Sequence, residues 1–123
     1  MEGHKMKKSD VIKQNVKYIL FNWIKDYCWH NKPINQSYEN YVKYVTEMED
    51  VEKDMTVEEA KRYLIDYVQQ TQSEKGIDTF IKELLWTHRK TSFGDLMKEA
   101  ELDFKNKRGL QRFIANHILS EIA

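Results

Sequence analysis

Apolar residues recur at intervals of three and four along almost the whole chain, and residues that interrupt helices are scarce. The 123 residues include four glycines and one proline. No segment shows sustained alternation of apolar and polar residues with β-branched enrichment, the pattern of a half-buried strand. The sequence therefore predicts an all-α fold, a compact bundle of five to six helices.

Turn and capping residues indicate where these helices begin. Hydroxyl and carboxylate side chains can accept hydrogen bonds from the free amides of a helix start, and Thr56-Val-Glu-Glu59 has the form of a capping box. Asn31-Lys32-Pro33 ends the first helix near Trp29. The expected first residues or caps are Ser9 or Asp10, Ser37, Thr56, Asp78, Thr91 or Ser92, and Lys107.

The length indicates one domain, because 123 residues can bury a core but are too few for two. We expect residues 1–8 to be flexible, 10–70 to form the N-terminal helices and 77–123 to form a C-terminal helical unit. No apolar run approaches the roughly 20 residues that span a bilayer. The single cysteine, Cys28, excludes an internal disulfide and fits a reducing compartment, so we expect a cytoplasmic protein.

The composition of the chain limits the classes of partner that it can bind. The net charge is zero, although lysine is in excess in residues 1–32 and acid in residues 36–66. A protein that binds polyanions in bulk usually has a stronger basic excess. Lysine greatly outnumbers arginine, and Asn, Ile and Tyr are common. This usage favours an AT-rich genome, and hence a bacterium, a phage or a mobile element.

The sequence lacks the residue spacings that are typical of catalytic and metal-binding sites. Cys28 and His30 point about 200° apart on a helix, which prevents a thiolate–imidazole pair. The four histidines show no zinc-ligand spacing, and no glycine-rich phosphate loop is present. Paired carboxylates such as Glu58-Glu59 lie in solvated runs. We therefore expect no enzyme activity, no cofactor and no metal.

The helix expected from residue 10 to 29 carries two apolar faces. The broad face comprises Ile12, Val16, Ile19, Leu20, Trp23, Ile24 and Tyr27. Val11, Tyr18 and Trp29 form a second line on the opposite side, with Phe21 nearby. Either other helices cover both faces, or Tyr18, Phe21 and Trp29 are exposed and anchor a protein partner or a homodimer. Neighbouring lysines leave base stacking as a further alternative.

The last helix separates into an apolar and a polar side. The apolar side comprises Leu110, Phe113, Ile114 and His117; the polar side comprises Lys107, Arg108, Gln111, Arg112 and Asn116. Arg, Gln and Asn can make bidentate contacts to base edges in the major groove, so this face is a candidate for binding nucleic acid or a protein. Together with residues 96–102 it suggests a helix-turn-helix. The connection from Asp103 to Gly109 is longer than the usual turn of three or four residues.

Residues 79–104, TFIKELLWTHRKTSFGDLMKEAELDF, resemble the opening of the small YozE-like helical domains, which are sterile-alpha-motif-like. The matching positions are Phe80, Leu84, Leu85, Arg89, Gly94, Asp95, Leu96 and Asp103. The Phe-Pro step that follows the Asp in that family is absent here, as is an early aromatic residue at Glu83. The resemblance implies a compact sterile-alpha-like bundle over the C-terminal unit. Such bundles serve mainly as association modules and have no catalytic residues to carry over.

The sequence as a whole predicts a non-enzymatic binding protein that docks on a macromolecule, most simply a protein. Its size and composition fit a phage or mobile-element inhibitor or adaptor of a host or defence complex. The alternative is a helix-turn-helix DNA-binding regulator, with the first helix forming a dimer.

Overall fold

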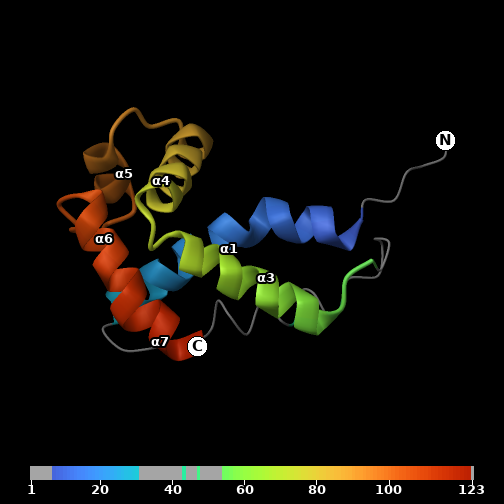
Figure 1. Ribbon diagram of the computed structural model, residues 1–123. Coiled ribbons are helices and arrows are strands. Elements are labelled where there is room, and N and C mark those ends of the chain that lie inside the picture. The colour runs from blue at the N-terminus through green and yellow to red at the C-terminus, as the bar shows by residue number, and fades with distance from the viewer. Residues whose placement is uncertain (1–6, 31–42, 44–46, 48–53, 123) are drawn as a thin grey trace.

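Helices make up almost all of the regular structure in the computed structural model, which describes residues 7–30, 43, 47 and 54–122 (Figure 1). The helices are α1 (Lys8–His30), α3 (Val57–Gln70), α4 (Glu74–His88), α5 (Phe93–Glu99), α6 (Lys107–Phe113), the π-helix η1 (Ile114–Leu119) and α7 (Ser120–Ile122). These residues include no β-strand, so the predicted all-α bundle is confirmed. The helix expected from Ser37 lies outside the described residues.

Helices α1 and α3 lie side by side and run in the same direction (Figure 1). Their starts are joined by Ser9, whose backbone N–H and hydroxyl both donate to the Asp54 carboxylate. Five of the seven residues of the broad apolar face of α1 are buried, Ile19 and Tyr27 are partly buried, and Trp23 has no exposed surface. Complete burial of one large apolar side chain stabilises the fold by about 1.5–3 kcal/mol. The other helices therefore pack against this face of α1. Of the segment 1–8 that is expected to be flexible, the structure describes Lys7 and Lys8, and Lys8 belongs to α1 and is buried.

The capping box of α3 is confirmed. The Thr56 hydroxyl accepts from the Glu59 N–H at 3.1 Å, and the Glu59 carboxylate accepts from the Thr56 N–H at 3.0 Å. The predicted cap of α4 is wrong, because Ser73 occupies that position and its hydroxyl accepts from the Gly76 N–H at 2.9 Å. Asp78 lies farther along the helix, where it bonds Lys107 at 2.9 Å.

Helix α4 packs against α1, α5 and α6 at the broader end of the molecule (Figure 1). It ends at Arg89, which adopts the left-handed conformation with φ 55° and ψ 43°. The Lys90 N–H reaches back to the Leu85 carbonyl at 2.9 Å, which closes the helix end. Ser92 is the cap of α5, one of the two residues that the sequence offered.

The last helix is continuous from Lys107 to Ile122 and contains the π-helix η1 at its centre. Its buried residues Leu110, Ile114 and Ile118 follow one another at intervals of four. Residues spaced by four drift by about 40° per step around a regular α-helix. The wider π turn, which bonds residue i to i+5, reduces that drift, so Ile114 and Ile118 stay on the face where η1 packs against α1 and α3.

The connection between α5 and α6 spans residues 100–106. Asn106 caps α6, so Gly109 lies within the helix and not in the predicted connection. Leu102 is buried, and the Phe104 ring packs on Phe113 with ring centroids 5.2 Å apart. This connection is an ordered part of the core, and it remains longer than a helix-turn-helix turn.

Candidate interaction surfaces

The three aromatic residues proposed as a partner-binding line have different environments. Phe21 is only 2% exposed, and its ring centroid lies 5.6 Å from that of His88 on α4. Tyr18 is half-buried, and its hydroxyl lies 3.3 Å from that of Thr87. Trp29 alone remains open, at 49% exposed, with the Lys25 ammonium 5.1 Å from its ring. An exposed line through Phe21 is therefore wrong, because α4 covers that side of α1.

The polar face of the last helix is partly committed to internal contacts. The Lys107 ammonium bonds the Asp78 carboxylate, and the Gln111 amide donates to the Thr71 carbonyl at 3.1 Å. Both contacts fasten α6 to the region where α3 turns into α4. Four side chains of this face are exposed, Lys107, Arg108, Arg112 and Asn116, and Lys107 is one of the two already engaged in an internal contact.

A more exposed aromatic residue was missed by the sequence interpretation. Trp86 on α4 is 84% exposed, and with Trp29 it makes up the exposed large apolar side chains among the described residues. Its position on a helical wheel, roughly 180° from the face that buries Phe80, Ile81 and Leu84, was a usable signal. An indole held in water exposes apolar area that contributes nothing to this fold, so it marks a candidate interaction site.

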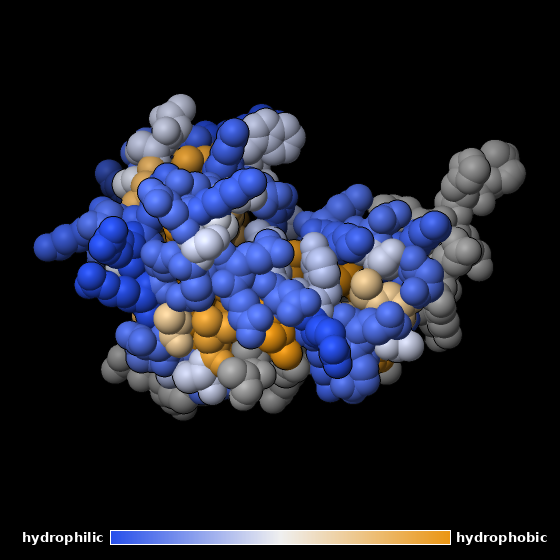
Figure 2. Space-filling model, viewed as in Figure 1, coloured by the Kyte–Doolittle hydropathy of each residue, from blue (hydrophilic) through white to orange (hydrophobic). Residues whose placement is uncertain are grey.

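Shallow hollows lie beside Trp86. One, of about 280 Å³, is lined by Lys17, Lys82, Glu83 and Trp86. Trp86 also lines a second hollow, which shares Arg89, Lys90 and Thr91 with a third that extends to Lys98 on α5. We call this region the Trp86 surface. Figure 2 shows the end of the molecule that contains α4 and α5 as mostly hydrophilic.

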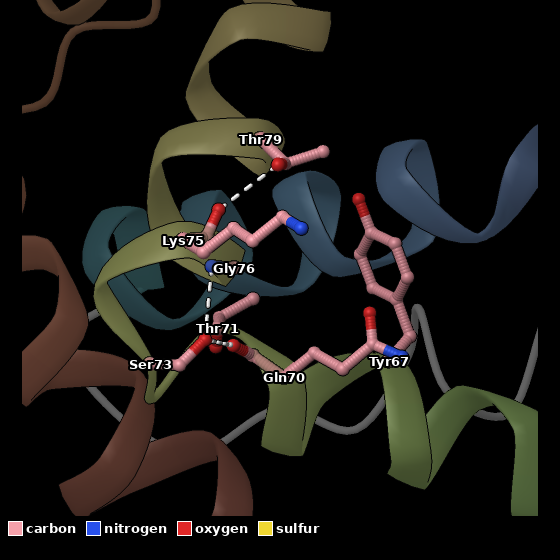
Figure 3. Close-up of a pocket in the computed structure, with 7 residues that line it drawn as sticks. All are labelled: Tyr67, Gln70, Thr71, Ser73, Lys75, Gly76 and Thr79. Carbon is pink, nitrogen blue, oxygen red and sulfur yellow. Dashed lines mark hydrogen bonds between the residues drawn. The ribbon is translucent and has the colours of Figure 1, made fainter.

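A separate pocket of about 220 Å³ lies where α3 turns into α4 (Figure 3). The hydroxyls that line it are already engaged: Thr79 donates to the Lys75 carbonyl, Ser73 to the Gln70 carbonyl, and Thr71 to the Val68 carbonyl. The Tyr67 hydroxyl donates to Glu83 at 3.4 Å. Burial, and then the nearby Glu83 carboxylate, raise the pKa of Tyr67, which keeps this hydroxyl protonated. The pocket is a product of the turn that joins the two helices.

Cys28 is half-buried, and its chemistry follows from that position. Burial, and then the nearby Asp103 carboxylate, raise the pKa of its thiol from 9.0 to about 11. The reactive thiolate is therefore about 100 times rarer near pH 8 than for an ordinary cysteine. We expect iodoacetamide to modify native Cys28 about 100 times more slowly than the same protein in denaturant, as followed by mass spectrometry. Equal rates in the two states would contradict the shift.

Groups of histidine, cysteine and carboxylate side chains that could hold a metal ion do not occur among the described residues. None of the described helices is long and apolar enough to cross a membrane. No family model, curated protein or solved structure matches the chain. The likeness of residues 79–104 to YozE-like domains stays a prediction.

Proposed function

We propose that this chain is a binding protein that docks on a protein partner through the Trp86 surface. The observation that carries the proposal is the 84% exposure of Trp86 beside two hollows lined by α1, α4 and the turn that follows α4. Tryptophan and arginine dominate the binding energy of protein interfaces, and Arg89 lines the same surface. The size and composition of the chain fit an inhibitor or adaptor from a phage or mobile element, and that role is part of this proposal.

A second candidate function is DNA recognition by the last helix. Arg108, Arg112 and Asn116 are exposed on one polar face and can reach base edges. Lys107 and Gln111 of the same face make internal contacts, which leaves a smaller reading surface. The short α5 and the connection from 100 to 106 also favour packing over groove reading.

Affinity capture with the tagged protein from a lysate of its native cell tests the proposal. We expect one protein to copurify with or without nuclease, and to be lost with Trp86→Ala at an unchanged melting temperature. The double variant Arg108→Ala, Arg112→Ala is the matched control on the opposite candidate face, and we expect it to retain the partner.

The reverse pattern would reject docking through Trp86. Capture that needs nucleic acid, falls steeply with salt and disappears in the double arginine variant would establish the DNA-binding alternative, since affinity for a duplex depends on the number of phosphates contacted.

A further inference from the structure

The hollows of the Trp86 surface are lined by more cationic than anionic side chains. The hollows are lined by Lys17, Lys82, Arg89, Lys90 and Lys98 against Glu83, Asp95 and Glu99. Lys17 pairs with Glu83 at 3.8 Å, and Lys90 with Glu99 at 2.9 Å. Within the described part of the chain, Lys82, Arg89 and Lys98 have no such carboxylate partner. The surface therefore offers Lys82 and Arg89 in the hollows that Trp86 lines, and Lys98 in the neighbouring hollow.

Arg89 holds an unfavourable backbone conformation at this surface. Its φ of 55° lies in the left-handed region, where an L side chain is disfavoured and glycine is usual at a helix end. Strain of this kind is concentrated at functional sites, where a side chain is needed at that place. Glu101, with φ 56°, has the same conformation after α5 but does not line the hollows, so it provides a matched control.

The Trp86 surface carries both cations and carboxylates, and this mixture favours an acidic peptide over a nucleic acid as the partner. Asp95 and the two paired carboxylates lie in the same hollows as the lysines. A nucleic-acid backbone carries a phosphate at every step and would meet these carboxylates along its length. A peptide can place its acidic side chains opposite individual cations and an apolar side chain on the indole.

Given the proposed docking function, on which this step rests, we infer that the Trp86 surface recognises an acidic protein segment. The segment has an apolar side chain that packs on Trp86, flanked by Asp or Glu residues that pair with Lys82, Arg89 and Lys98. The ion pairs Lys17–Glu83 and Lys90–Glu99 link α4 and the turn after it to α1 and α5 beside the site.

Selection from a random peptide display library tests this inference, with counterselection on the Trp86→Ala variant. We expect the recovered peptides to carry Asp or Glu beside an apolar residue. Trp86→Ala should weaken the best peptide by about 30-fold or more, the scale of an interface hot spot. Raising the salt from about 0.05 M to about 0.5 M should weaken it further.

The two left-handed residues separate binding from folding. Arg89→Gly should raise the melting temperature by relieving strain, yet weaken the peptide by about 3-fold to 10-fold through the lost charge. Glu101→Gly should raise the melting temperature similarly and leave peptide affinity unchanged. Equal loss of affinity in both variants would overturn the role of Arg89.

The remaining outcomes discriminate between the two proposals. Peptides that depend on Trp86 but lack acidic enrichment would overturn the acidic segment and leave docking through Trp86 standing. Failure to recover any peptide that depends on Trp86 would overturn the acidic segment, while docking through Trp86 would fall only if the captured partner were also retained by Trp86→Ala. Tighter binding of a single-stranded oligothymidine than of any peptide, with the same dependence on Trp86 and Arg89, would replace the acidic segment by nucleic acid.

Discussion

Replacing Gly76 by alanine should lower the free energy of unfolding by about 3 kcal/mol, the scale of severe overpacking. A Cβ at this position would lie 2.5 Å from the carbonyl carbon of Gln70 and closer still to its oxygen. Both groups are backbone atoms of a tight turn between α3 and α4, so neither can swing aside. The melting temperature should fall by about 10 °C in thermal unfolding followed by circular dichroism.

The direction of this effect is opposite to that of an ordinary helical glycine. Alanine is usually favoured over glycine inside a helix by about 0.5–1 kcal/mol, because it loses less conformational freedom on folding. Gly109 on α6 provides the control, since a Cβ there would have the Asn106 side-chain oxygen as its nearest neighbour at 3.7 Å. We expect Gly109→Ala to be stabilising. A Gly76→Ala variant as stable as the wild type would mean that the Gln70 carbonyl does not lie against α4.

The contrast between these glycines shows which structural features local sequence can predict. The capping box at Thr56 and the cap at Ser92 use contacts between residues three apart, so they can be predicted without knowledge of the fold. The start of α4 was misplaced at Asp78 because Gly76 looks like a helix breaker. Its actual role depends on where α3 ends, and that depends on packing around Thr71 and Gln111.

The exposure of a side chain is likewise predictable from local sequence in some places and dependent on packing in others. Helix α4 has a single apolar face, and the wheel position of Trp86 opposite that face favoured an exposed indole. The environment of Phe21 was not predictable in this way, because periodicity identifies the faces of a helix without saying which are covered. It is the crossing of α4 over α1, recorded in the contact of Phe21 with His88, that buries this ring. The contacts of Lys107 with Asp78 and of Gln111 with Thr71 likewise join residues far apart in the sequence. The helical pattern of the last helix could not predict them.

Replacing Phe21 by alanine should therefore cost about 3–5 kcal/mol, the usual range for removing a buried phenyl ring. The ring fills space between α1 and the end of α4 and is 2% exposed. Its loss would leave a cavity beside the His88 ring and the Lys25 side chain, whose ammonium lies 5.0 Å from the Phe21 centroid. Urea denaturation at constant pH measures this change directly.

Trp29 is the matched comparison, because it also contacts Lys25 and also belongs to the second line of α1. Its 49% exposure limits the expected cost of Trp29→Ala to less than about 1 kcal/mol. A large loss of stability for Phe21→Ala with a small one for Trp29→Ala would show that the second apolar line is divided between core and surface. Comparable small losses would mean that α4 does not cover Phe21, and the exposed aromatic line, the second alternative that the sequence left open, would then be the better interpretation.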